Sequence, residues 1–320
     1  MVLDVGYSGA RGLHLIRGRS IDQAAIASPT NPIRGETTNT LANVRLRAPL
    51  QGWDPANFTQ IESAGASWYN ALLIGLNKRF NHGLQAQVSY TFSRNLTTDP
   101  LTSINGNGGF SNGDQNNPKL RYGPDFFVRE HRLIANFTYQ FPGPRNLSSP
   151  RGWILGGWGV AGVTTIQSGH KLLVVFNPNG QNIFGQSADR ASLSSACAKG
   201  HYLNPGSVTA NLNAYINASC FTAPTPFSAD DPLGLGFGNS GVGIFDGPGQ
   251  NNFDLSLSKR FAFRSPSENS FLEFRSEFFN AFNHPQFCDP HVLFNSQTFG
   301  QISCTSVAPR IIQFALKFSF

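Results

Sequence analysis

The chain has 320 residues and a net charge of +6, and only 13% of its residues are charged, about half of the roughly 25% typical of soluble globular proteins. The basic residues form no block, which argues against a nucleic-acid-binding protein. No apolar run reaches the roughly 18–20 residues that a membrane-spanning helix needs. Phenylalanine (28) and glycine (33) are frequent beside many small polar residues, a mixture that favours strands with one lipid-facing and one water-facing side.

Seven segments alternate apolar and polar residues with the period of two that a β-strand requires, and an eighth, 153–169, is glycine-rich and has an ambiguous register. In chain order they are 1–7, 68–80, 84–93, 133–141, 153–169, 252–263, 272–282 and 310–320. The last is the clearest, because one face carries Ile312, Phe314, Leu316, Phe318 and Phe320. We therefore expect an all-β fold, an antiparallel transmembrane β-barrel segment of about eight meandering strands.

The connections between these segments alternate in length. The short ones are 81–83, 142–152 and 264–269, and the long ones are 8–67, 96–127, 170–250 and 283–308. Outer-membrane barrels have short periplasmic turns and long extracellular loops. With the C-terminus in the periplasm, every short connection is periplasmic and every long one is extracellular. Val88, Leu255 and Leu316 are then predicted to face lipid, and Ser89, Ser256 and Ala315 to face the lumen.

The four cysteines fall in two pairs, each inside one predicted outer loop. We expect the disulfides Cys197–Cys220 and Cys288–Cys304, with free thiols or a zinc site as the alternatives.

Two groups of charged residues are candidate sites. Glu273, Arg275 and Glu277 share one strand face and predict lumen-facing charges, either an ion-pair ladder or part of a substrate path. A second group precedes the strand 133–141 and predicts a charged rim above the lipid, with an acid/base site as the alternative; it comprises Asp125, Arg129, Glu130, His131 and Arg132. The histidines lack metal-ligand spacing and no G-x-S-x-G motif is present, so we expect no enzyme, no catalytic or metal-binding residue and no cofactor.

Five phrases carry a family resemblance: VGYSGARGLHL (5–15), YNALLIGLNKRF (69–80), GLQAQVSYTFSR (83–94), GPGQNNFDLSLSKRF (247–261) and FRSEFFNAFNHPQF (274–287). Together they resemble the C-terminal barrel of TonB-dependent outer-membrane receptors, in particular the Oar-like subgroup with a carboxypeptidase-regulatory-like N-terminal domain. The resemblance implies a barrel of about 22 strands and energised uptake. It implies that 1–320 is the C-terminal part of that barrel, without the plug domain and the TonB box.

The resemblance also implies a location and partners. The location is the outer membrane of a Gram-negative-type bacterium. The partners are outer-membrane lipid, the barrel-assembly machinery, the TonB complex through the missing N-terminal part, and an unknown imported ligand such as a carbohydrate or a siderophore, but no nucleic acid. The final strand resembles a C-terminal assembly signal formed by Phe314, Leu316, Phe318 and Phe320.

Two other functions remain open at this point. A complete eight-stranded barrel with a structural or adhesive role is one, because eight strands can close. A secreted β-sandwich acting as a carbohydrate-binding module is the other, and it would hide the phenylalanine-rich faces between two sheets.

Overall fold

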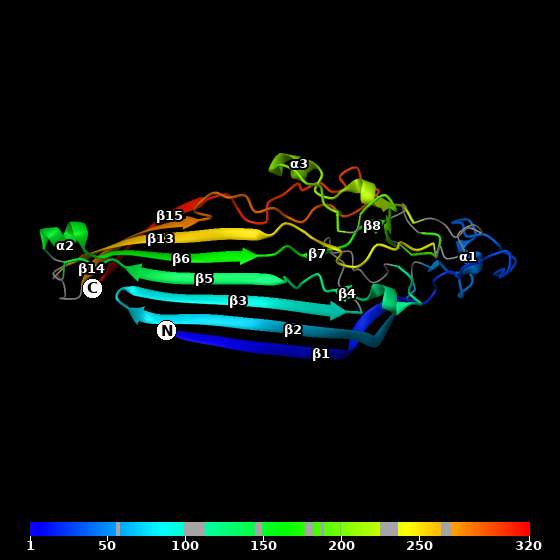
Figure 1. Cartoon of the computed structure of the whole chain (residues 1–320), viewed down its shortest axis with the longest axis horizontal. Helices are drawn as coiled ribbons and strands as arrows, with labels where there is room; N and C mark the ends of the chain where they lie inside the picture. Colours follow the sequence, from blue (N-terminus) through cyan, green and yellow to red (C-terminus); the bar gives the residue numbers. More distant parts are fainter. Residues whose placement is uncertain are drawn as a thin grey trace.

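A computed structural model describes residues 1–55, 58–98, 113–144, 149–176, 182–186, 189–198, 200–224, 236–263 and 270–320. Its main feature is one antiparallel sheet of nine strands, eight of which follow a single path in chain order (Figure 1). These are β1 (Val2–Ser20), β2 (Thr59–Asn81), β3 (Leu84–Thr97), β5 (His131–Gln140), β6 (Trp158–Gln167), β13 (Gln250–Ala262), β14 (Phe271–Phe279) and β15 (Ile311–Ser319). The ninth, β4 (Gly123–Pro124), pairs with the end of β3. The predicted all-β antiparallel meander is confirmed.

The sheet is open. Strands β1 and β15 form its two edges and do not pair with each other in the part of the chain that the structure describes. All eight long strands belong to this one sheet, so the described residues do not form the two facing sheets of a sandwich.

The connections separate into two ends of the sheet. At the turn end, β2 and β3 are joined by His82 and Gly83, both with positive φ (50° and 80°), as a tight two-residue hairpin requires. Both chain termini and α2 (Pro150–Leu155) lie at this end, and the described parts of the four long connections lie at the other, the loop end (Figure 1). The predicted alternation of short and long connections is confirmed.

Strand register assigns every side chain to one of two faces, because directly paired residues point to the same side. Val88 pairs with Leu76 and Ala135, and Leu255 pairs with Phe278. The apolar face defined in this way includes Leu3, Val5, Leu72, Ile74, Leu76, Val88, Tyr90, Phe137, Leu255, Leu257, Phe274, Phe278, Phe314, Leu316 and Phe318.

The opposite, polar face carries Ser89, Ser256 and Ala315, so these residues are separated from Val88, Leu255 and Leu316 as predicted. Large side chains on the apolar face stay exposed: Phe314 and Leu316 are each 67% exposed. An apolar surface of this size needs a partner other than water, and hydrocarbon is the partner of a barrel's outer face.

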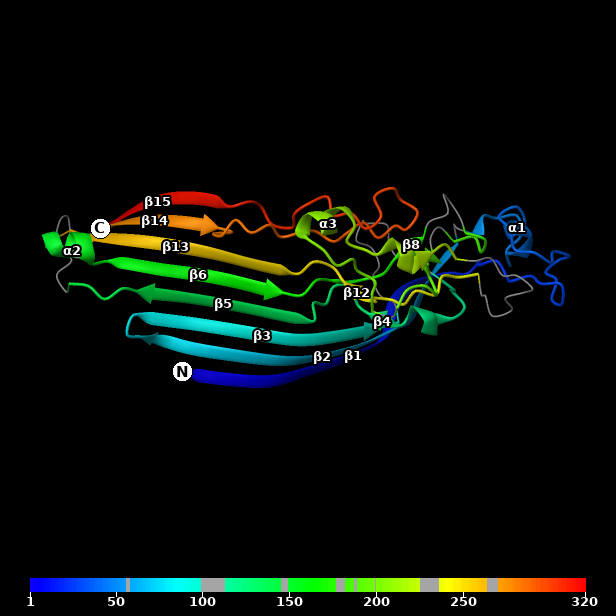
Figure 2. The same cartoon turned by 45° about the horizontal axis from the view of Figure 1, so that its top comes forward.

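The main hydrophobic core lies at the loop end, within a region we call the loop cap, the described residues of 21–58, 98–130, 168–249 and 280–310. Its buried members are Leu172, Val174, Ala191, Ile216, Cys220, Phe221 and Phe245. Figure 2 shows α3, β8 and β12 gathered there. The short elements of the cap are α1 (Val44–Arg47), η2 (Pro118–Arg121), β7 (Lys171–Leu172), β8 (Val175–Phe176), β9 (Asp189–Arg190), β10 (Ser192–Leu193), α3 (Val208–Asn213), η3 (Ala218–Cys220), β11 (Phe221–Thr222) and β12 (Phe245–Asp246).

Several predicted boundaries differ from the structure, and three of the differences have a local explanation. The segment 153–169 begins with α2 rather than a strand, because Pro150 occupies the first turn and Ser149 caps it by accepting a hydrogen bond from the Gly152 amide at 3.0 Å. The connection predicted at 8–67 is shorter, because β1 and β2 continue pairing past irregularities beside His14, whose φ is 56°. The strand 272–282 ends at Phe279, just before Asn280, which has a φ of 50°.

No helix among the described residues is long and apolar enough to cross a membrane.

Candidate functional site

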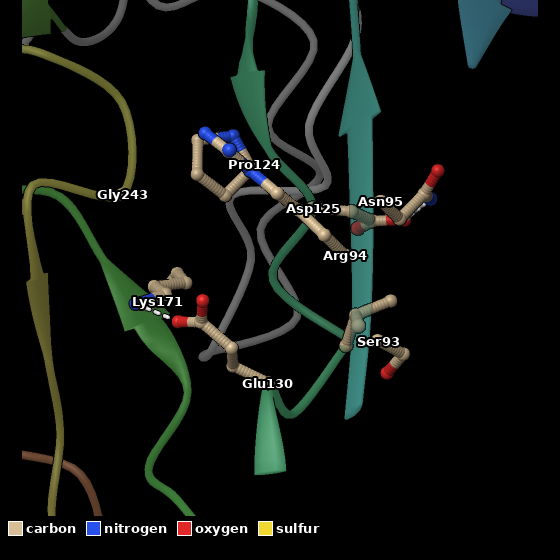
Figure 3. A pocket seen from close by; sticks show the side chains of 9 residues that line it. Ser93, Arg94, Asn95, Pro124, Asp125, Glu130, Lys171 and Gly243 are labelled. Carbon is tan, nitrogen blue, oxygen red and sulfur yellow. Dashed lines mark hydrogen bonds and ion pairs between the residues drawn. The ribbon is translucent and has the colours of Figure 1, made fainter. Parts of the chain in front are cut away.

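A polar pocket of about 260 Å³ lies where the main sheet meets the loop cap. We call it the loop-end pocket. It is lined by Ser93, Arg94, Asn95, Pro124, Asp125, Val128, Glu130, Lys171 and Gly243 (Figure 3). Residues from β3, β4, β7 and the segment before β5 converge there, so the pocket is assembled from parts of the chain far apart in sequence.

One lysine joins two carboxylates beside this pocket. The ammonium nitrogen of Lys171 lies 2.8 Å from Glu130 Oε2, a contact drawn in Figure 3, and 2.9 Å from Asp246 Oδ1. The hydrogen bond from Lys171 holds the pKa of Glu130 below its ordinary value. Burial alone would lower the pKa of Lys171, but its bonds to Glu130 and Asp246 outweigh burial and raise it. Glu130 and Lys171 are therefore charged at neutral pH.

The charged residues predicted to form a rim before β5 have different surroundings in the structure. Asp125 and Glu130 line the loop-end pocket, and Asp125 Oδ2 accepts a hydrogen bond from Asn95 Nδ2 at 2.9 Å. Arg129 donates instead to the Ser168 carbonyl oxygen at 2.5 Å. Of the five residues only Asp125 and Glu130 line the pocket, so the set does not converge on one reacting centre.

His131 shows where the rim meets the apolar face. It pairs with Phe92 on that face, and its Nδ1 lies 2.8 Å from the Tyr90 hydroxyl oxygen. The ring of Phe92 packs against the imidazole with centroids 5.1 Å apart.

A second polar cluster next to the pocket has no local sequence signal. His170 Nδ1 lies 2.6 Å from Asp289 Oδ2, although the two residues are 119 positions apart. Phe126 covers the imidazole, with ring centroids 4.6 Å apart. The Tyr215 hydroxyl donates to the Asp246 carbonyl oxygen at 3.0 Å, and burial raises the pKa of Tyr215 to about 12. Only the folded loops bring these groups together.

The predicted charge row on β14 forms an ion-pair ladder on the polar face. Glu273 accepts from Arg260 at 2.8 Å and from Arg275 at 2.7 Å. Arg275 also reaches Glu277 at 3.5 Å, and Lys317 of β15 stands opposite Glu273 in the register. These charges lie on the side away from Phe274 and Leu316, and their exposure to a lumen stays a prediction.

Both predicted disulfide pairs, Cys197–Cys220 and Cys288–Cys304, are present in the loop cap. Cys220 belongs to the main core and is 1% exposed, so the first bridge ties the surface around Cys197 to that core.

The proposed assembly-signal residues end the apolar face of the last strand. They are exposed by 67% (Phe314 and Leu316), 50% (Phe318) and 83% (Phe320). Their role in assembly stays a prediction.

Comparison with known proteins agrees with this architecture. A family model described as "Outer membrane beta barrel domain" matches residues 1–313. No curated protein and no solved structure matches the chain. The match spans nearly the whole sheet, whose strands carry one apolar and one polar face, and this family points to the bacterial outer membrane. The chain belongs to the outer membrane beta barrel domain family.

Proposed function

We propose that this chain forms the last eight strands of the barrel wall, and the ligand-contacting outer loops, of a TonB-dependent outer-membrane transporter. In this proposal the protein is not an enzyme. The loop cap contacts an imported solute, the polar face lines the path, and a plug domain coupled to TonB controls passage. The resemblance of five sequence phrases to such receptors is the source of the proposal.

The observation that supports it most is the open sheet. Strands β1 and β15 remain edges in the described part of the chain. In hydrocarbon each bare backbone N–H or C=O costs several kcal/mol, so both edges need strand partners. Further strands of a larger barrel would supply them, and the short polar side chains of the polar face suit a wide wall better than the packed interior of a narrow barrel.

Uptake in cells tests the transport function. Strains that lack this gene, or lack TonB, are compared with the parent for accumulation of radiolabelled oligosaccharides and ferric siderophores. Loss of the same solute in both mutants is expected. Uptake that persists without TonB, but disappears without this gene, would contradict energised transport.

Cross-linking tests the alternative of a small closed barrel with a structural or adhesive role. A single cysteine at Phe314 on β15 is combined in turn with cysteines along β1, and the protein is oxidised in the membrane. No intramolecular cross-link is expected, because the two strands are separated by the rest of the wall. A cross-link confined to one β1 position would mean that β1 pairs with β15 and would overturn the proposal.

A further inference from the structure

The turn between β5 and β6 carries an apolar surface that the barrel wall does not require. Its helix α2 presents three consecutive large side chains outward: Trp153 is 44%, Ile154 71% and Leu155 62% exposed. Turns at this end of a barrel are usually short. The helix thus places apolar side chains beyond the ends of the strands, where Figures 1 and 2 both show α2.

The helix is fixed to the apolar side of the sheet rather than to the polar side. Trp153 packs edge-on against Phe261 and Phe263, with ring centroids 6.2 and 5.6 Å apart. Phe261 pairs with Leu272 and lies on the apolar face with Leu255. Trp153 therefore continues the apolar face of the sheet onto α2.

One lysine of that face holds the end of the helix. Lys259 pairs with Trp158 and Phe274 on the apolar face, yet it is only 4% exposed. Its ammonium group donates to the carbonyl oxygens of Ile154, at 3.2 Å, and of Gly156. A cation at the C-terminus of a helix also satisfies carbonyl groups that have no partner within the helix.

Aromatic rings complete the attachment. The ammonium group of Lys259 lies 4.9 Å from the ring centroid of Trp158 and 5.3 Å from that of Phe261. The Trp158 indole N–H donates to the same Ile154 carbonyl oxygen at 3.0 Å. Two side chains of the apolar face therefore bind the C-terminal end of α2.

The chain leaving α2 passes so close to β13 that position 157 requires glycine. Gly157 has a φ of 72°, and a Cβ there would collide with the Arg260 carbonyl oxygen. The amide of Arg260 donates to the Gly157 carbonyl oxygen at 2.8 Å, so the helix is joined to the strand β13 directly at its exit.

Other cations at this end have the position expected of groups near lipid phosphates. Lys78 lies in the apolar row of β2, but its ammonium group reaches back to the carbonyl oxygens of Asn81 and Leu84, both at 3.3 Å. Arg151 is exposed on α2 itself. Long basic side chains that cover apolar surface and extend toward a polar boundary are typical of a membrane interface.

We propose that α2 is an interfacial helix that lies in the periplasmic leaflet of the outer membrane, with Trp153, Ile154 and Leu155 among the phospholipids. Lys259 is the positioning residue that holds it there. Lipid is the occupant because Trp153 joins α2 to the apolar face through Phe261 and Phe263, Ile154 and Leu155 are exposed beside it, and Arg151 of the same helix is exposed. The mode of binding is that of a short amphipathic helix lying in the plane of the interface.

Tryptophan quenching tests this arrangement in the full-length protein, reconstituted in vesicles of phosphatidylethanolamine and phosphatidylglycerol. The Trp153 signal is the difference between the parent and Trp153→Phe. Lipids brominated close to the headgroup should quench this signal more than lipids brominated near the chain ends, because an interfacial helix lies only about 5–10 Å into the headgroup and acyl boundary. Trp53, which is 61% exposed in the loop cap, is the control: acrylamide in the water should quench its signal and brominated lipid should not.

Lys259→Met tests the positioning role, with Lys78→Met as the matched control on the same face and at the same end. Only folded protein, selected by heat-modifiable gel migration, is compared. In Lys259→Met the Trp153 signal should lose lipid quenching and gain acrylamide quenching; in Lys78→Met it should not change. A parent Trp153 signal quenched by acrylamide alone would place α2 in water and overturn the proposal. A signal protected from both quenchers would indicate a protein contact and would also overturn it. If the two lysine substitutions changed the quenching of the Trp153 signal equally, Lys259 would have no specific role in positioning α2.

Discussion

The two ends of the sheet are stabilised in different ways. The turn end is built from adjacent strands: a two-residue hairpin joins β2 and β3 at His82 and Gly83, and α2 is held by side chains of the paired strands β6 and β13. The loop end is built from distant groups. Gln186 Nε2 donates to Ser20 Oγ across 166 positions, and Gln23 Nε2 donates to Asp114 across 91. The turn end therefore leaves its apolar side chains exposed on the sheet and on α2, whereas the loop end is held by buried polar contacts and disulfides that resemble the interior of a soluble domain.

The largest expected effect is the loss of membrane assembly when the last residue at the turn end is changed. Phe320→Asp should abolish assembly into the outer membrane, because it puts a charge at the exposed end of the apolar face, where Phe320 is 83% exposed. The measurement is the amount of heat-modifiable protein in the outer-membrane fraction. Ser319→Asp, on the polar side of the same strand, is the control and should assemble. Normal levels of Phe320→Asp would show that this residue is not part of the assembly signal.

The second effect compares the two faces in the middle of the sheet. Leu255→Arg should cost roughly 2–4 kcal/mol of folding free energy, because it places a charge in hydrocarbon. Ser256→Arg, one residue along β13, should cost much less. Urea unfolding in lipid vesicles measures both variants. Equal costs would mean that the apolar and polar faces do not meet lipid and water as assigned.

The strands could be predicted from sequence because the alternation of apolar and polar residues shows directly which side chains share a face. Val88 and Leu255 stand 167 positions apart, yet strand register places both on the apolar face, as alternation predicts. The helix α2 was missed for a local reason. Trp153 has the aromatic character of a strand end, but Ser149 and Pro150 are a helix start signal that the strand interpretation overlooked.

The loop-end contacts could not be predicted in the same way. The pairing of His170 with Asp289 leaves no trace in the sequence near either residue. It depends on the paths of two long connections, and neither connection has a hydrophobic period that fixes its path. The cysteines are the exception, because each pair lies within one connection and the closed loop is short.

The third effect separates the loop cap from the sheet. Replacing Cys197 and Cys220 together by alanine should destabilise the cap by roughly 3 kcal/mol, the value expected for closing a loop of this length, and should leave the sheet folded. Limited proteolysis would then cut the cap, while gel migration would stay heat-modifiable. Replacing Cys288 and Cys304 together by alanine is the comparison, because this bridge also closes a short loop of the cap. Its loss should cost less stability, because Cys304 is exposed whereas Cys220 belongs to the buried core. Loss of the whole sheet on removing the first bridge would contradict the separation.

The fourth expected effect is a pH dependence of the stability of the loop cap, caused by the buried carboxyl group of Asp189. Burial raises the pKa of Asp189 from 3.8 to about 6, against hydrogen bonds from the Gly238 and Arg190 amides. A raised folded-state pKa contributes stability that is complete below the unfolded value and is lost as pH rises through about 6. Cap stability should fall by about 1 kcal/mol between pH 5 and pH 7.5. Glu130 contributes little in this window, because its pKa is lowered and its stabilisation is lost only on acidification below its ordinary value.

Hydrogen exchange of the cap amides, corrected for the intrinsic effect of pH, measures this change. Asp189→Asn should abolish the dependence between pH 5 and pH 7.5, because the variant cannot lose a proton. A slope that survives in Asp189→Asn would assign it to another group.

The smallest expected effect on stability concerns the ion-pair ladder on the polar face of the sheet. Glu273 accepts from two arginines, Arg260 and Arg275, whose side chains are 49% and 46% exposed. Ion pairs with half-exposed partners are screened by water and contribute at most about 1 kcal/mol. Glu273→Gln should therefore lower stability by less than that amount, and Glu277→Gln should lower it less still, because Glu277 has one arginine contact at 3.5 Å. Urea unfolding in vesicles at low and high salt measures both. Salt should erase the difference if the ladder faces an aqueous lumen, whereas a difference that persists in high salt would mean that water does not reach this face.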